Sequence, residues 1–242
     1  MKSKKLDGTA IKLIAIFCML IDHIGAAIIE NGVMEGALPR SPFLTIDLFL
    51  RGIGRIAFPI FCYTLVEGFT YTHNKAKYLG RLLLFCAISE VPFDAAFSMK
   101  FIDNGHQNVF FTLALGLMAM IVLDWGEKQI ANKWILGLFD FMITFGFMGL
   151  AEVLSTDYSA CGVLAILSIY FLRKIPILAI VAPTLVLVLF YQWIEAPAAL
   201  SIPILLCYNH QKGKGLKYFF YAFYPLHLAL LYILLYFVVL QK

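Results

Sequence analysis

Charged residues are scarce in this sequence. Only 14% of the 242 residues are Asp, Glu, Lys or Arg, whereas 62% are hydrophobic, and the mean hydropathy is +0.85. Soluble domains are about half apolar and about a quarter charged, so this composition does not fit a water-soluble globular protein. A soluble core of this length could not bury so many apolar side chains. The composition therefore predicts an integral membrane protein whose excess apolar surface is covered by lipid.

Signals of several other protein classes are missing as well. The five cysteines lie inside apolar runs and none forms a CxxC pair, so neither a disulfide framework nor a zinc site is predicted. No GxxxxGK[ST] motif occurs, which leaves ATP without support as an energy source. No internal repeat, low-complexity tract or linker divides the chain. We expect a single transmembrane domain over residues 1–242, with no metal and no nucleic-acid partner.

Long apolar runs are abundant instead. A helix needs about 20 mostly apolar residues to cross the hydrocarbon core of a membrane. The runs predict an all-α, polytopic transmembrane helical bundle of about eight or nine spans. These spans fall near residues 11–30, 52–71, 79–97, 108–123, 134–151, 158–172, 175–193, 196–208 and 218–240. The run 196–208 is short and contains Pro197 and Pro203, so a re-entrant or broken segment is the alternative to a full crossing there.

The placement of basic residues indicates the orientation. With the N-terminus in the cytoplasm, most basic residues between spans fall on the inner side. The outer loops instead collect the acidic residues Glu35, Asp47, Asp103, Glu152, Asp157 and Glu195. The inner set is Lys2, Lys4, Lys5, Lys12, Lys75, Lys77, Arg81, Lys128, Lys133, Arg173, Lys174, Lys212, Lys214 and Lys217, and Arg40, Lys100 and Lys242 fall outside. Because the asymmetry recurs from loop to loop, it predicts a multi-pass protein of the cytoplasmic membrane with a cytoplasmic N-terminus.

Ionisable residues inside spans are costly and are therefore candidates for function. His23 follows Lys12 by eleven residues, about three helical turns, so the two share one face and His23 lies near mid-membrane. A neutral imidazole there can act as a general base, and a core histidine bonded to a neighbouring helix is the alternative. Asp22 points about 100° away from His23, so we expect it to face another helix, at Arg51 or Arg55.

A second histidine lies in the last span. His227 is nine residues beyond Tyr218, at a depth similar to that of His23. Pro225, just before it, is expected to bend the helix and to free a backbone carbonyl. A catalytic or substrate-positioning role and a structural hydrogen bond to another helix are both open for His227. The candidate catalytic residues are His23, Asp22 and His227.

Carboxylates and arginines supply candidate substrate contacts. Glu90 and Asp94, four residues apart, share a face of one predicted helix and could bind a cationic amine or take its proton. Asp157 and Asn108 begin predicted helices, so an N-cap is the favoured alternative for both. An interfacial anchor is the alternative for the two arginines, which also share a face. The candidate substrate-binding set is Arg51, Arg55, Glu67, Glu90, Asp94 and Asp157.

Two basic clusters are predicted to face the cytoplasm. They are Lys75, Lys77 and Arg81, and Lys212, Lys214 and Lys217. Either cluster could hold phosphates or could only fix the topology, and topology alone is the favoured role of the second.

Six segments of the chain, in this order, resemble the TraX family: LDGTAIKLIAIFCMLIDHIG, GRIAFPIFCYTLVEGF, ISEVPFD, QNVFFTL, STDY and FYPLHLALL. The resemblance covers nearly the whole chain, and IDHIG and ISEVPFD are its most specific parts. A member of that family is implicated in the N-terminal acetylation of conjugative pilin. The resemblance therefore implies acetyl transfer at a membrane.

The first span also bears a more distant similarity to integral-membrane acyltransferases of the acyltransferase-3 type. Those enzymes have a basic residue, ten intervening residues and a catalytic histidine in their first helix, which is the spacing of Lys12 and His23. They also use a cytoplasmic arginine pair near acyl-CoA, to which Lys77 and Arg81 correspond in region but not in spacing. Glu67 begins Glu-Gly-Phe where those enzymes have Ser-Gly-Phe, which is a further departure.

Together these observations predict an acetyl-CoA-dependent N- or O-acetyltransferase. The phosphates of acetyl-CoA would bind Lys12, Lys77 and Arg81, and His23 would take the acceptor's proton or carry the acetyl group. The expected acceptor is an amine, such as a protein or peptide N-terminus, or a hydroxyl on the extracytoplasmic side. A proton-coupled small-molecule transporter and a non-catalytic membrane assembly factor are the alternatives. Membrane lipid is the other expected partner, and the sequence leaves the oligomeric state open.

Overall fold

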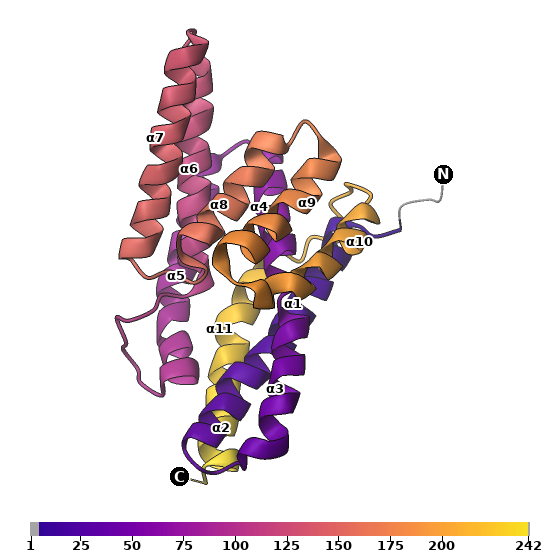
Figure 1. The fold of residues 1–242 in the computed structure, drawn as a ribbon, viewed down its shortest axis with the longest axis vertical. Coiled ribbons are helices and arrows are strands. Elements are labelled where there is room, and N and C mark those ends of the chain that lie inside the picture. Colours follow the sequence, from indigo (N-terminus) through magenta and orange to yellow (C-terminus); the bar gives the residue numbers. More distant parts are fainter. Residues whose placement is uncertain (1–4, 242) are drawn as a thin grey trace. The chain divides into compact units, whose positions relative to one another are not determined.

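The computed structural model describes residues 5–241, and the regular elements in them are helices, with no strand (Figure 1). The prediction of an all-α protein is thus confirmed for this part of the chain. Lys2, Lys4 and Lys242, which entered the prediction of orientation, lie outside the described residues. The described residues divide into two compact units. That the two form the single domain expected from the sequence stays a prediction.

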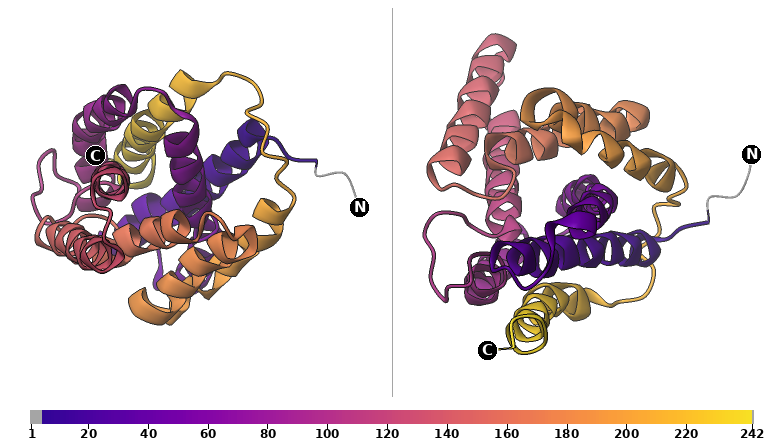
Figure 2. Two further views of the ribbon diagram at one scale, coloured as in Figure 1. Left: turned by 90° about the horizontal axis from the view of Figure 1, so that it is seen from above. Right: turned by 60° about the horizontal axis from the view of Figure 1, so that its bottom comes forward.

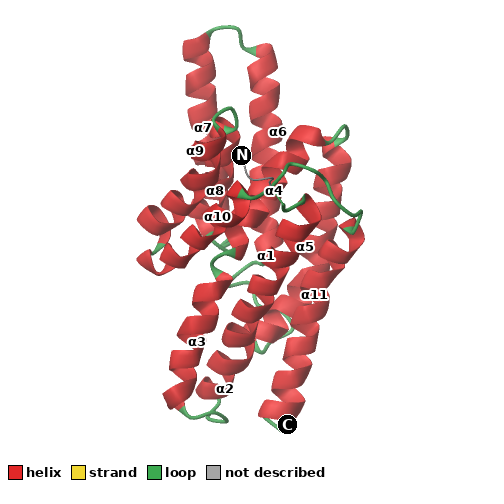
Figure 3. Ribbon diagram, turned by 90° about the vertical axis from the view of Figure 1, so that its right-hand side faces the viewer, coloured by secondary structure: helices red, strands yellow, loops and turns green. Residues whose placement is uncertain are grey.

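Unit 1 combines residues 5–61, 87–103 and 194–241. In it, α1 and α3 lie side by side (Figures 1 and 3), and α11 packs against α1 and η1. Its elements are α1 (Gly8–His23), the π-helix η1 (Ile24–Glu30), α2 (Asn31–Met34), α3 (Arg40–Gly54), most of the 3₁₀ helix η3 (Trp193–Leu200), α10 (Ser201–Leu206), α11 (Lys217–Leu234) and the π-helix η4 (Leu235–Val239). The α4 helix (Ala57–Tyr71) leads the chain out of unit 1, and α5 (Lys75–Ser98) leads it back.

Unit 2 combines residues 62–86 and 104–193. In it, α6 and α7 run side by side and are joined by a short turn at one end (Figure 3), and α8 packs against α6, α7 and α9. Besides parts of α4 and α5, the elements of unit 2 are α6 (Val109–Gln129), α7 (Lys133–Val153), α8 (Ser159–Leu172), α9 (Pro176–Val186) and the π-helix η2 (Leu187–Tyr191). Most large apolar side chains of α7 are exposed, which fits a helix with a face covered by lipid.

The side chains of Asn108 and Asn132 cap the first turns of α6 and α7 in unit 2. Asn108 Oδ1 accepts a hydrogen bond from the N–H of Phe110 at 3.0 Å, so the predicted N-cap of α6 is confirmed. The same prediction for Asp157 is wrong, because the residue before α8 is Tyr158, in the left-handed region at φ 61°. The Asp157 Oδ1 lies 3.7 Å from Nε2 of His106 instead. Its carboxylate faces a loop side chain and is not used to cap a helix.

Five helices among residues 5–241 are long and apolar enough to cross a membrane. They are Gly8–Met34, Arg40–Tyr71, Val109–Gln129, Lys133–Val153 and Lys217–Val239. The other predicted spans coincide with α5 and with shorter apolar helices, so the count of eight to nine spans stays a prediction. Residues 40–51, which the predicted spans 11–30 and 52–71 leave in an outer loop, form most of the helix α3 instead. Asp47 and Arg51 reduce the apolar signal of this segment, although Arg51 pairs with Asp22 and Glu30 of unit 1.

The proline-containing run 196–208 is not one continuous α-helix. It begins in the 3₁₀ helix η3, which contains Pro197, and continues as the six-residue α10, which contains Pro203. Proline lacks the N–H that an α-helix needs and clashes with the preceding turn, which accounts for the break. The expectation of a broken segment is met here.

Cysteine labelling tests the predicted orientation. In a cysteine-free variant, Lys100→Cys should react with a membrane-impermeant thiol reagent in intact cells, and Lys133→Cys should react only after lysis. Both lysines are exposed, so accessibility within the protein does not limit the reaction at either site. Labelling of Lys133→Cys before lysis, with Lys100→Cys protected, would indicate the opposite orientation in the membrane.

Candidate functional site

Two histidines that are far apart in the sequence meet in unit 1. His23 is the last residue of α1, and its Nδ1 lies 2.7 Å from Nε2 of His227 on α11. The two rings are almost parallel, with an interplanar angle of 9° and 5.0 Å between their centroids. The sequence placed both residues at a similar depth, and the structure places them in direct contact. The candidate site is built around this pair.

The hydrogen bonds of His227 define which ring nitrogens carry protons. Its Nδ1 lies 2.7 Å from the carbonyl oxygen of Phe223, which can only accept, so Nδ1 carries the proton. The Nε2 of a neutral His227 must then accept, and the Nδ1 of His23 must donate to it. This leaves the lone pair on Nε2 of His23. That atom lies 4.0 Å from Asp22 Oδ2, beyond hydrogen-bond distance, and is therefore the basic atom of the pair.

The carbonyl that holds His227 is not the one expected from its proline. Pro225 removes the N–H that would bond to the carbonyl four residues earlier, at Tyr221. The His227 ring instead bonds to the carbonyl of Phe223, four residues before itself, by turning back along its own helix.

Aromatic rings enclose the histidine pair. Phe97 on α5 meets His23 edge-on at 5.2 Å between centroids, and Tyr224 meets both imidazoles edge-on. Phe223 stacks on His227 at 4.8 Å. These contacts limit rotation of both rings and keep the hydrogen bond aligned. Sequence reasoning did not single these aromatic residues out, because 22 Phe and 12 Tyr are spread along the whole chain.

A change of helix type follows His23 directly. The seven residues of η1, Ile24–Glu30, form a π-helix before the chain returns to α-helix in α2. π-helical turns are rare and are frequent at functional sites, because the wider turn changes which way the flanking side chains point. The apolar sequence IGAAIIE carries no signal for this change, so it could not be predicted.

Two arginines of unit 1 bind carboxylates from other elements. Arg51 Nη1 lies 2.5 Å from Asp22 Oδ2, and Arg51 Nε lies 3.4 Å from Glu30 Oε1. Arg55 Nη1 lies 3.1 Å from an oxygen of Glu195, a residue only 1% exposed. The expected contact of Asp22 with an arginine of the next helix is therefore present. Glu195 was missed, because the sequence assigned it to an outer loop. An acidic residue between apolar neighbours was the available signal.

Glycines allow α1 and α3 to approach closely beside the site. A Cβ on Gly54 would overlap the carboxylate of Asp22, and a Cβ on Gly25 would lie 2.5 Å from Asp47 Oδ1. Small residues at such crossings let the backbones come together and let polar side chains occupy the space. The Asp22–Arg51 ion pair therefore depends on the missing side chain of Gly54.

The other predicted site residues of unit 1 make contacts of their own, outside the histidine pair. Asp94 is buried, and its Oδ2 accepts a hydrogen bond from the N–H of Asp103 at 2.7 Å, which closes the loop after α5. Glu90 lies one turn earlier on the same helix and is half-buried. Lys12 Nζ lies 5.9 Å from the centre of the Phe220 ring, which joins α1 to α11.

The other predicted site residues belong to unit 2. Glu67 lies on α4, Lys77 and Arg81 lie in the first turns of α5, and Asp157 precedes α8. The predicted phosphate site of Lys12, Lys77 and Arg81 combines residues of both units, so it stays a prediction.

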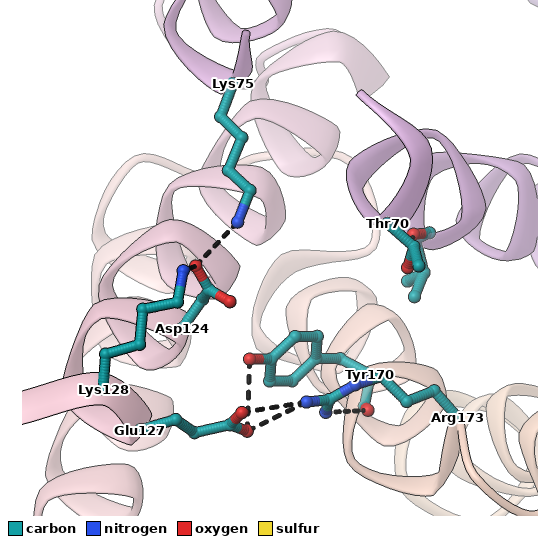
Figure 4. Close-up of polar contacts among 8 residues, drawn as sticks. Thr70, Lys75, Asp124, Glu127, Lys128, Tyr170 and Arg173 are labelled. Carbon is teal, nitrogen blue, oxygen red and sulfur yellow. Dashed lines mark hydrogen bonds and ion pairs between the residues drawn. The ribbon is translucent and has the colours of Figure 1, made fainter. Parts of the chain in front are cut away.

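Unit 2 has its own group of charged residues (Figure 4). Lys75 and Lys128 both place Nζ at 2.7 Å from Asp124 Oδ2, and Arg173 Nη2 lies 3.0 Å from Glu127 Oε2. The three cations thus share two carboxylates of α6, and these ion pairs tie the ends of α5 and α8 to that helix. Sequence reasoning used the basic members to assign the orientation, left phosphate binding open for Lys75, and did not identify the two acidic residues.

Known proteins match this chain over nearly its full length. A family model described as TraX protein matches residues 7–235. A protein of Dichelobacter nodosus named "Probable fimbrial assembly protein FimC, serogroup H1" is 31% identical over 256 aligned residues, covering 95% of this chain and 96% of the relative. No solved structure matches the chain. The similarity to acyltransferase-3-type enzymes rests on the Lys12–His23 spacing and stays a prediction.

Substitution of two glycines on α3 tests the close approach. We expect Gly54→Ala to destabilise the protein by about 1–3 kcal/mol, because the added methyl overlaps Asp22 and separates α1 from α3. Gly52→Ala is the matched control, since its Cβ would meet only Pro197, at 3.8 Å, and alanine favours a helix by about 0.5–1 kcal/mol. Thermal unfolding of the purified variants measures both. Equal unfolding temperatures for Gly54→Ala and Gly52→Ala would contradict the close approach of α1 and α3 at Gly54.

Proposed function

Since this chain belongs to the TraX family, we propose that it is an integral-membrane acetyltransferase of the cytoplasmic membrane. The reaction transfers an acetyl group from cytosolic acetyl-CoA to an amine or hydroxyl on the extracytoplasmic side. The observation that supports it most is the His23–His227 hydrogen bond, because its direction leaves a basic nitrogen on His23. Five apolar helices long enough to cross a membrane are consistent with a multi-pass protein.

The proposed chemistry uses Nε2 of His23 as a general base. The acceptor nitrogen or oxygen attacks the thioester carbonyl carbon while Nε2 takes the acceptor's proton. The carbon–sulfur bond then breaks, CoA leaves as a thiolate, and the proton passes from Nε2 to that sulfur. An acetyl-histidine intermediate would use the same lone pair as a nucleophile.

Neighbouring residues would support the charge that His23 gains. Protonated His23 still donates from Nδ1 to His227, because Phe223 fixes the accepting tautomer of that ring. The carboxylate of Asp22 lies 4.0 Å from Nε2 and would stabilise the imidazolium by its negative charge. His227 and Asp22 are therefore proposed as positioning residues, with His23 as the catalytic residue.

The name of the relative suggests which acceptors to examine first. The Dichelobacter protein is named as a fimbrial assembly protein, so we propose a fimbrial or pilin-type subunit, modified at an amine, as the acceptor class for this chain. The same name favours one alternative, a non-catalytic assembly factor, in which the histidine pair would only join α1 to α11.

Replacement of His23 tests the proposal. His23→Gln keeps the side chain's hydrogen-bonding capacity but cannot take the proton, so acetyl transfer should fall by about 10²–10⁴. Transfer of labelled acetyl from acetyl-CoA to membrane protein and peptide fractions measures the rate. CoA affinity and the unfolding temperature, measured on the same sample, should stay near the wild-type values. Full activity in His23→Gln would overturn the catalytic assignment, and a wild type that neither transfers acetyl nor binds CoA would favour the assembly factor.

Replacement of His227 separates the base from the residue that positions it. His227→Gln can still accept from Nδ1 of His23, so kcat should fall less than in His23→Gln. His227→Leu removes a hydrogen bond worth about 1 kcal/mol and should lower kcat by about three- to tenfold more than His227→Gln, at little change in KM. Equal losses in His227→Gln and His23→Gln would contradict this division of roles.

A further inference from the structure

A basic loop is attached to the start of α1 in unit 1. Residues 207–216 connect α10 to α11, and Figure 2 shows this segment passing beside the first turn of α1. Leu6 N–H donates to the Cys207 carbonyl at 3.2 Å, and Asn209 N–H donates to the Leu6 carbonyl at 2.8 Å. Gly8 N–H donates to the Gln211 carbonyl at 2.7 Å. The loop is therefore held in a defined position by main-chain hydrogen bonds on both sides of the start of α1.

The loop brings lysines from both ends of the chain together. Thr9 Oγ1 donates to the carbonyl of Lys214 at 2.7 Å, so the stretch Lys212–Gly213–Lys214 lies directly against the first turn of α1. Gly213 has φ +71°, a conformation that suits glycine and turns the chain at this point. The lysines of these adjoining segments, called here the inner lysine cluster, are Lys5, Lys12, Lys212, Lys214 and Lys217.

Three lysines of the cluster differ from the basic residues of unit 2 in their charge partners. Lys75, Lys128 and Arg173 are paired with carboxylates, whereas no carboxylate among residues 5–241 forms an ion pair with Lys212, Lys214 or Lys217. Asp7 is the acidic residue of this region, and its Oδ1 accepts a hydrogen bond from the N–H of Ala10 as the cap of α1. The side chains of the three lysines are exposed. The cluster therefore keeps a positive charge that a phosphate can neutralise.

The cluster lies at the start of both helices that carry the histidine pair. Lys12 is eleven residues before His23 on α1, about 16 Å along the axis, and Lys217 is ten residues before His227 on α11, about 15 Å. Lys12 Nζ also lies over Phe220, so the two helices are in contact near these ends. A ligand that binds both places needs phosphates at one end and its reactive group at the end of a long arm.

We infer that the inner lysine cluster binds the phosphate groups of the CoA donor, so that unit 1 alone holds both ends of the donor. The inference rests on the proposed function and replaces the phosphate site that the sequence predicts across Lys12, Lys77 and Arg81. The adenosine phosphates lie at the cluster, and the pantetheine arm runs along α1 and α11 with its thioester at Nε2 of His23. The same chemistry would also attract the headgroup of an anionic lipid, so the experiment separates the two sources.

The test measures CoA affinity of the full-length protein in zwitterionic lipid by calorimetry. Lys212→Gln/Lys214→Gln should weaken CoA binding tenfold or more, because two charge-assisted contacts to phosphate are lost, while Lys212→Arg/Lys214→Arg should retain it. Lys133→Gln/Lys174→Gln is the matched control, since it removes the same charge from exposed positions of unit 2 and should bind CoA as the wild type does. The unfolding temperature of each variant reports whether it is folded.

The outcomes distinguish this site from the proposed function. CoA affinity equal to the wild type in the folded Lys212→Gln/Lys214→Gln variant overturns the cluster as the donor site and leaves the role of His23 unaffected. In a parallel preparation that contains anionic lipid, weaker lipid binding by that variant, with CoA affinity unchanged, would assign the cluster to lipid headgroups and would equally overturn the donor site. Absence of CoA binding by the wild type contradicts the acetyl-CoA reaction itself.

Discussion

The hydrogen bond between His23 and His227 is the contact on which the candidate site depends. An imidazole buried in an apolar bundle loses its contacts with water, and a polar group left unpaired there costs free energy. Each ring meets part of that requirement with the other ring, and the carbonyl of Phe223 satisfies the outer nitrogen of His227. Because that carbonyl can only accept, it determines the tautomer of both rings. One main-chain oxygen thereby determines which nitrogen of His23 is basic.

Ion pairs made by arginines in and next to α3 fix the positions of the elements around the histidine site. Arg51 binds carboxylates that precede and follow the site on the first helix, Asp22 and Glu30, and Arg55 binds Glu195 on η3. Buried ion pairs contribute little net stability, because desolvation offsets much of the attraction, but removal of one partner is costly. Their effect here is geometric. They align α1, η1 and η3 with α3, and with them the end of α1 where His23 lies.

Much of this site could be predicted from the cost of placing ionisable residues in lipid. That principle selected His23, His227, Asp22 and Arg51, and the structure brings these four together as two contacting pairs. It could not give the hydrogen-bond direction, because the direction depends on a main-chain oxygen that every residue possesses.

Other features had no signal or a misleading one. The π-helix after His23 is an apolar stretch like any other in sequence, and Phe97 is one aromatic residue among many. Most of α3 was assigned to a loop because Asp47 and Arg51 lower its apolarity. The charge of Arg51 is compensated by Asp22 and Glu30, which are distant in sequence, and a local reading of hydropathy cannot detect such partners. The same limit explains why Glu195 was placed outside.

The direction of the hydrogen bonds also bears on whether the histidine pair could conduct protons or could only take up and return one. A relay that conducts protons needs a donor and an acceptor at both ends, so that each proton can leave by a different atom from the one it entered. The chain of hydrogen bonds that begins at His23 ends at the carbonyl of Phe223, which has no proton to pass on and cannot retain one. A proton taken up at Nε2 of His23 must therefore leave from the same nitrogen. Uptake and return at one atom is what a general base and acid does in acyl transfer, and it argues against a proton wire that runs through the histidine pair.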